Sequence, residues 1–147
     1  MNKLKSFLVV AALCFFSKSY GQLGVSYHQS NLPFVGINYE VGTRFVPEVR
    51  LGTDSFTSDL SLEAVANYKI LSQIDYDFYA GLGGRAGDYE GLVIPVGLNF
   101  YPFEEKNFGF HIELASIIGE SNLVRGSWGI RYRFGSRKVR YNLNLNE

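Results

Sequence analysis

From about residue 23 to residue 134 the chain alternates apolar and polar residues with a period of two, and no stretch keeps the spacing of an amphipathic helix. Short groups of turn residues divide the alternation into eight segments, each predicted to be a β-strand. The predicted strands are 23–29, 34–41, 44–54, 60–70, 75–85, 91–101, 107–118 and 122–134. Because no linker or helix-sized gap separates them, we expect one continuous antiparallel up-and-down sheet.

Each predicted strand has one apolar phase and one polar phase, and the glycines indicate which phase faces inward. The polar phase contains Gly24, Gly36, Gly52, Gly81, Gly83, Gly97, Gly109 and Gly129. A glycine on a water-exposed strand packs nothing and costs entropy. Inside a narrow eight-stranded barrel it leaves room for long side chains. We therefore predict a closed barrel with its polar phase inside and its apolar phase toward lipid.

This orientation predicts a network of charged side chains inside the barrel. Its predicted members are Glu40, Arg44, Glu48, Arg50, Glu63, Lys69, Asp77, Glu113, Arg131 and Arg133, with Arg85, His111 and Arg125 on the same phase. Opposed residues of a hairpin have a nearly constant summed number. That rule places Arg50 opposite Glu63 and Lys69 opposite Asp77. Solvated charges at strand ends are the alternative, chiefly for Lys69 and Asp77.

Aromatic residues of the apolar phase gather near one edge of the predicted barrel. They are Tyr39, Phe45, Tyr68, Tyr76, Phe78, Phe100, Phe108, Phe110, Tyr132 and Phe134. An aromatic girdle at a membrane interface has this arrangement. Aromatic residues are also common in strands generally, but that does not explain their gathering at one edge.

Residues 1–21 have the features of a cleaved signal peptide. Lys3 and Lys5 precede an apolar run that is too short to span a bilayer, and small residues precede a predicted cleavage before Gln22. A lipoprotein signal at Cys14 is the alternative, but Leu13 is not the small residue that such a signal requires. Cleavage would remove the only cysteine and three lysines. The remaining chain would then have a net charge of (14 − 3) − 14 = −3.

The last predicted strand ends in a pattern that outer-membrane barrels use for recognition during insertion. Ser127, Gly129, Tyr132 and Phe134 occupy its positions. With the signal peptide and eight strands, residues 22–135 resemble the small OmpA/OmpX-type outer-membrane barrels, in the form common in the Bacteroidetes. The resemblance implies the outer membrane as location, its lipid and lipopolysaccharide as partners, handling by the barrel-assembly machinery, and a monomer.

The chain departs from this family pattern after Phe134, where many members end. We expect 136–147 to be a polar periplasmic tail, although alternation at 139–145 leaves a ninth strand open. Eight strands, an even number, place both termini of the chain on the periplasmic side.

Candidate chemistry is sparse. Lys and Arg together equal Asp and Glu, so no basic surface is available for nucleic acid. We expect no metal site and no cofactor, because His28 and His111 are the only histidines and a metal site needs further converging ligands. A lipid-modifying enzyme using Ser26 and His28 has no evident acid to orient the base.

We therefore predict a non-enzymatic membrane barrel without an open pore. A secreted or periplasmic lipocalin-like carrier of a small apolar ligand is the alternative.

Overall fold

The computed structural model describes residues 21–53 and 60–135, and within these ranges it contains eight strands and no helix. Two predicted segments lie outside the described residues: the signal peptide at 1–21, of which only Gly21 is described, and the tail at 136–147. Within the described ranges, no helix is long and apolar enough to cross a membrane. The strands are β1 (Gln22–Ser30), β2 (Phe34–Glu40), β3 (Phe45–Gly52), β4 (Leu62–Ser72), β5 (Tyr76–Ala86), β6 (Gly91–Phe100), β7 (Phe108–Gly119) and β8 (Leu123–Phe134).

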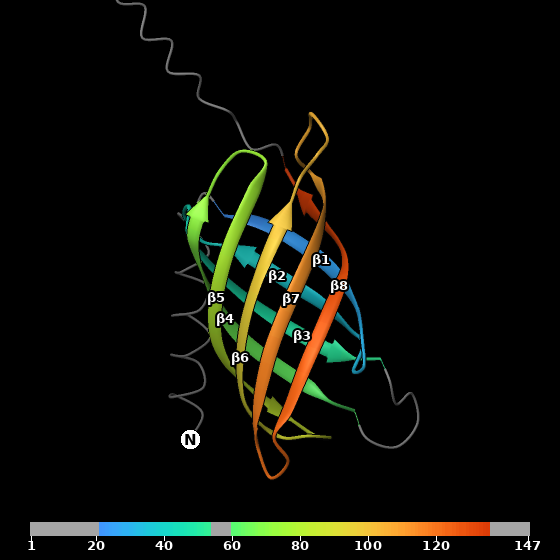
Figure 1. Ribbon diagram of the computed structural model, residues 1–147. Helices are drawn as coiled ribbons and strands as arrows, with labels where there is room; N and C mark the ends of the chain where they lie inside the picture. Colours follow the sequence, from blue (N-terminus) through green and yellow to red (C-terminus); the bar gives the residue numbers. More distant parts are fainter. Residues whose placement is uncertain (1–20, 54–59, 136–147) are drawn as a thin grey trace, which may run out of the picture.

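These strands form a closed antiparallel barrel with up-and-down connections (Figure 1). Each strand pairs with the next, and β1 pairs with β8 so that Leu23 lies opposite Phe134. The predicted fold is therefore confirmed, and the predicted strand ends differ from the observed ones by no more than two residues. Closure leaves no strand edge with unpaired backbone groups.

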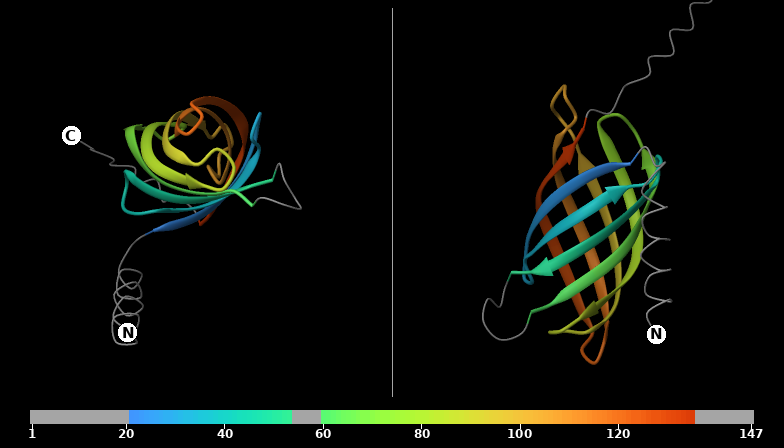
Figure 2. Two further views of the ribbon diagram at one scale, coloured as in Figure 1. Left: turned by 90° about the horizontal axis from the view of Figure 1, so that it is seen from below. Right: turned by 180° about the vertical axis from the view of Figure 1, so that it is seen from behind.

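The two ends of the barrel differ, and we name them by their contents. The terminal end carries Gln22, Phe134 and the turns at 41–44, 73–75 and 101–107. It lies at the top in Figure 1, and the second view in Figure 2 shows the same arrangement from behind. The far end carries the connections at 31–33, 87–90 and 120–122. The start of β1 and the end of β8 thus lie at the same end of the barrel, as an even number of strands requires.

The barrel has an apolar outer surface and a largely charged interior. Ile112, Val124 and Trp128 are 65%, 68% and 66% exposed, whereas Arg50 and Glu63 are each 1% exposed. Side chains on alternate residues of a strand point to opposite faces. The two faces therefore follow directly from the period-two pattern, with the apolar phase outside.

One part of the interior is apolar, which the alternation did not predict. Toward the far end, Val65, Val93, Ala115 and Ile117 are buried together with Leu32 from the 31–33 connection. Leu123 packs against this group from the start of β8. We call these six residues the apolar layer. Five of its members, all except Leu32, lie on the inward-facing phase of their strands. The alternation therefore predicts that these side chains point inward, but it does not predict that the interior is apolar at this level.

The interior charge network as candidate functional site

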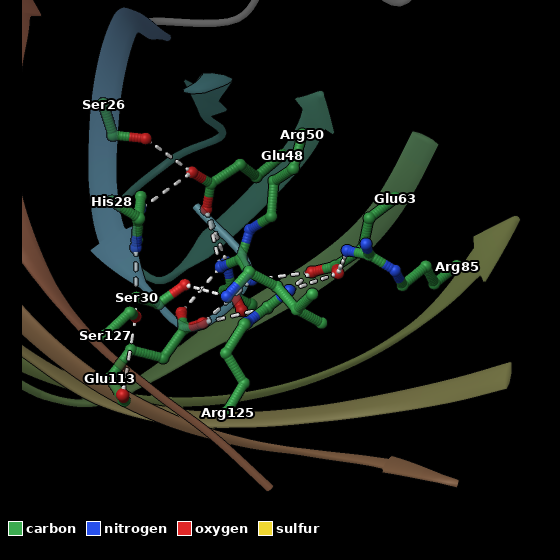
Figure 3. Close-up of polar contacts among 12 residues, drawn as sticks. Ser26, His28, Ser30, Glu48, Arg50, Glu63, Arg85, Glu113, Arg125 and Ser127 are labelled. Carbon is green, nitrogen blue, oxygen red and sulfur yellow. Dashed lines mark hydrogen bonds and ion pairs between the residues drawn. The ribbon is translucent and has the colours of Figure 1, made fainter. Parts of the chain in front are cut away.

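The centre of the network is a set of bidentate and bridging ion pairs across the lumen. Arg50 on β3 donates to Glu63 Oε1 on β4 at 2.8 Å and to Glu113 Oε2 on β7 at 2.6 Å. Arg125 on β8 donates to Glu63 Oε2 at 2.8 Å. Figure 3 shows these side chains converging from four strands. Because they extend from facing walls, these long side chains span the lumen with charge-assisted hydrogen bonds.

Glu48 forms a second junction within this central group. Its carboxylate accepts hydrogen bonds from Ser26 Oγ at 2.9 Å and Arg50 Nη2 at 3.2 Å. Asn67 Nδ2 and Arg131 Nη2 donate to the same carboxylate at 3.2 and 3.3 Å. A buried carboxylate needs several donors to offset its lost hydration. Four donors from four strands supply them here.

A separate cluster lies nearer the terminal end. Lys69 Nζ lies 2.7 Å from Glu40 Oε1 and 3.2 Å from Asp77 Oδ2. Arg133 donates to Asp77 from the opposite side, and its guanidinium stands 3.7 Å from the ring centre of Tyr101. Both carboxylates of this cluster are therefore shared between two cations.

The buried charges are nearly balanced overall. Among the described residues, the buried cations number six and the buried carboxylates five. They are Arg50, Lys69, Arg85, Arg125, Arg131 and Arg133, with Glu40, Glu48, Glu63, Asp77 and Glu113. Close pairing of opposite charges makes so many buried ions tolerable in a narrow interior.

Arg44 is a correction to the predicted network. It lies in the 41–44 turn, before β3 begins at Phe45, and it is exposed. Its guanidinium lies 3.5 Å from the carbonyl oxygen of Ile70, and no ion pair of Arg44 is found within the described residues. The predicted strand began one residue too early, so the alternation was extended into a turn where it no longer fixes direction.

Neutral partners complete the network, and the alternation pattern does not distinguish them from other polar-phase residues. Tyr79 donates its hydroxyl to Glu113 Oε2 at 2.7 Å, and its ring occupies space left by Gly97. Phe34 is buried beneath the guanidinium groups of Arg50 and Arg125, at 4.9 and 4.4 Å from its ring centre. Such cation–π contacts partly replace the hydration that each guanidinium loses.

The two histidines meet inside the barrel. The ring centres of His28 and His111 are 3.7 Å apart, and His28 also stacks on Phe34 at 4.0 Å. Nδ1 of His28 lies 3.4 Å from Ser127 Oγ, and Nε2 lies 3.9 Å from Glu48. This group has the residue types of a hydrolase triad, but His28 is 0% and Ser127 4% exposed. Within the described residues, no group of three His, Cys, Asp or Glu side chains is arranged for a metal ion.

The residues of the predicted insertion pattern divide between the two faces. Ser127 and Gly129 face the lumen, whereas Tyr132 and Phe134 are 41% and 50% exposed on the outer surface. Gly129 lies opposite both His28 on β1 and His111 on β7. A Cβ at this position would collide with the backbone oxygen of Tyr27. The glycine therefore has a packing role in addition to any role in recognition.

Several buried polar atoms near the terminal end have no hydrogen-bond partner among the described residues. They are Asn38 Nδ2, Asn99 Oδ1, the Tyr101 hydroxyl, and both ring nitrogens of His111. Burial raises the pKa of the Tyr101 phenol above its ordinary value, so this hydroxyl stays protonated near neutral pH. Buried polar groups in proteins are almost always hydrogen-bonded, to protein or to water.

The comparisons with known proteins identify the fold. No family model and no curated protein sequence matches the chain. The N-terminal β-barrel domain of Pseudomonas aeruginosa OprF matches with a TM-score of 0.61 and 16% identity, over 78% of this chain and 96% of that one. The Yersinia pestis outer membrane protein Ail matches with a TM-score of 0.51 and 16% identity, over 80% and 100%. A de novo designed transmembrane β-barrel matches with a TM-score of 0.54 and 18% identity, over 78% and 94%. The chain has the fold of eight-stranded outer-membrane barrels.

Proposed function

We propose that this protein is a non-enzymatic integral barrel of the bacterial outer membrane, with a structural, envelope-integrity or surface-interaction role. The observation that carries the proposal is the reversed distribution of polarity. Outward side chains such as Ile112, Val124 and Trp128 are about two-thirds exposed, and the interior holds eleven buried charges. In water, an apolar surface around a whole barrel would cause aggregation. In a lipid bilayer the same apolar surface is removed from water, which stabilises the folded barrel.

The aromatic residues support the same location. Tyr68, Phe100 and Tyr132 are 51%, 47% and 41% exposed on the outer surface near the terminal end. Aromatic rings are favoured at a membrane–water interface. The terminal end would then face the periplasm, which agrees with export through a signal peptide at 1–21.

A soluble carrier is not supported by the interior. The lipocalin-like alternative requires an empty apolar cavity, but Arg50, Glu113 and Arg125 bridge the lumen at its centre. An enzymatic role has little support either, because Ser26, His28 and Ser127 are all enclosed by the barrel wall. The proposed partners are outer-membrane lipid and lipopolysaccharide, and the barrel-assembly machinery during insertion. We propose a monomer without cofactor.

Fractionation tests the proposal directly. The protein should be found with outer-membrane vesicles and resist extraction by carbonate, and unboiled samples should migrate differently from boiled ones on a denaturing gel. Such heat-dependent migration reports a folded barrel that survives detergent. Recovery of folded protein in the soluble periplasmic fraction would refute the proposed location.

A further inference from the structure

We propose that the terminal half of the lumen is a water-filled chamber that opens only at the terminal end, and that Tyr101 is its gate. This inference concerns the interior of the folded barrel. It goes beyond the proposed envelope role and does not depend on it.

The first step is the need for water inside the barrel. Asn38, Asn99 and His111 are buried, yet each has at least one polar atom without a protein partner. Asn99 lies directly opposite His111 in the pairing of β6 and β7, and both side chains are buried on the lumen side. Leaving such groups without any hydrogen-bond partner would destabilise the folded barrel. Bound water, with two to four polar partners available, removes that cost.

The second step is closure toward the far end. Val93 and Ile117 of the apolar layer are 0% exposed, and Leu32 is folded over them from the 31–33 connection. Between this layer and the chamber, Arg50 and Arg125 are tied to carboxylates on opposite walls. Among the described residues, these two layers therefore block the lumen between the far end and Asn99.

The third step is the position of Tyr101 at the terminal end. Its side chain is 0% exposed although the residue lies beyond the last residue of β6. The ring rests against Gly109, where an added Cβ would lie 2.5 Å from Tyr101 Cδ1. On its other side the ring faces the Arg133 guanidinium. Tyr101 thus fills the mouth of the lumen from a turn and not from the barrel wall.

The fourth step is the weak attachment of that turn. The Tyr101 backbone donates to Asp75 O at 2.7 Å, and Lys106 Nζ donates to Tyr101 O at 3.0 Å. Lys106 also pairs with Asp75, whose side chain is 60% exposed. An ion pair this accessible to water contributes little stability. Opening the mouth therefore breaks the Tyr101 N–H bond to Asp75 and this exposed ion pair, while Arg133 N keeps its hydrogen bond to Asn107 O at 2.8 Å and the ladder hydrogen bonds of β6 and β7 stay intact.

Cysteine labelling tests the gate. The only native cysteine is Cys14, so a Cys14→Ala background carrying Asn99→Cys gives one reactive thiol in the chamber. We would measure its rate of modification by a small charged methanethiosulfonate reagent in the folded, full-length protein in detergent. Labelling should be slow while Tyr101 is present, because the reagent reaches the thiol only when the turn opens locally. After Tyr101→Ala we expect a rate at least about tenfold higher, because local opening is then no longer required. Tyr101→Phe should leave the rate unchanged, because the ring and not the hydroxyl closes the mouth.

A thiol at the far end is the matched control. Ser61→Cys replaces a buried residue that hydrogen-bonds Arg85 outside the chamber, and its labelling rate should not respond to Tyr101→Ala. If Tyr101→Ala does not fold, Lys106→Gln releases the turn while keeping the ring, and it should accelerate labelling at position 99 alone. Equal acceleration at positions 61 and 99, fast labelling with Tyr101 intact, or no acceleration at 99 would each overturn the proposal. None of these outcomes depends on whether the barrel resides in the outer membrane.

Discussion

At the scale of single residues, the interior network makes some charges far more important than others. Arg50 contacts three carboxylates, Glu48, Glu63 and Glu113, and is 1% exposed. Arg44 is exposed, and no ion pair links it to the described part of the chain. The two arginines are six positions apart, so they form a matched pair that differs mainly in burial.

We predict that Arg50→Met lowers the free energy of unfolding by about 3–5 kcal/mol, because it leaves buried carboxylates without their main cation. Water in the lumen would bring the loss toward the lower value. Arg44→Met should change the free energy of unfolding by no more than about 0.5 kcal/mol. Urea denaturation of the folded protein in lipid vesicles measures both values. Equal losses for the two variants would contradict the network as a source of stability.

At the scale of strands, Gly129 of the predicted insertion pattern is also required by the packing of its neighbours. It lies opposite His28 on one side and His111 on the other, so that their rings meet over the inner face of β8, and the Tyr27 backbone lies where its Cβ would be. Gly126 on the same strand faces outward, and a Cβ there would only touch Leu114 at 3.7 Å. A Cβ would therefore be blocked at position 129 and accommodated at position 126, three residues away on the same strand.

We predict that Gly129→Ala destabilises the folded barrel by about 1–3 kcal/mol, as overpacking does, whereas Gly126→Ala is neutral within about 0.5 kcal/mol. The folded fraction on unboiled gels and the urea midpoint would provide the measurement. If Gly129→Ala reduced insertion in cells but left the stability of refolded protein unchanged, recognition and not packing would explain this glycine.

Strand pairing also shows how far the sequence determined the site. Arg50 lies opposite Glu63 as the hairpin arithmetic predicted, because β3 and β4 pair without interruption. Lys69 lies opposite Tyr79 and not Asp77, so that predicted register is wrong. The pairing shifts between Lys69 and Leu71, and alternation does not reveal such an irregularity. The ion pair with Asp77 still forms, because a lysine side chain is long enough to reach diagonally.

Other parts of the site could not be predicted for a different reason. Period-two alternation assigns a direction to each residue, but contacts across the lumen depend on how eight tilted strands are staggered. The meeting of Glu113 with Arg50, 63 positions apart in the chain, is of this kind. So is the contact between the tilted rings of His28 and His111.

At the scale of the whole molecule, the outward apolar surface should respond to charge as a lipid-facing surface does. Ile112 is 65% exposed near the middle of β7. Ile112→Arg should reduce the stability of the inserted barrel by about 2–4 kcal/mol. Tyr89→Arg, in the exposed 87–90 connection, should have almost no effect. Folding titrations in lipid vesicles would compare the two variants. A tolerated arginine at position 112 would argue against contact with the hydrocarbon core.

The closed interior leads to a last prediction, that the purified protein forms no stable large-conductance channel in planar bilayers. An eight-stranded barrel is just wide enough for its interior to be filled by side chains. Here two different barriers act in series, the bridge between Arg50 and Glu113 and the apolar layer around Val93 and Ile117. Tyr101→Ala should therefore remain non-conducting, because it opens only the terminal half of the lumen. Stable conductance steps from the unmodified protein would refute the closed interior, and steps appearing only with Tyr101→Ala would mean that the far end is not sealed.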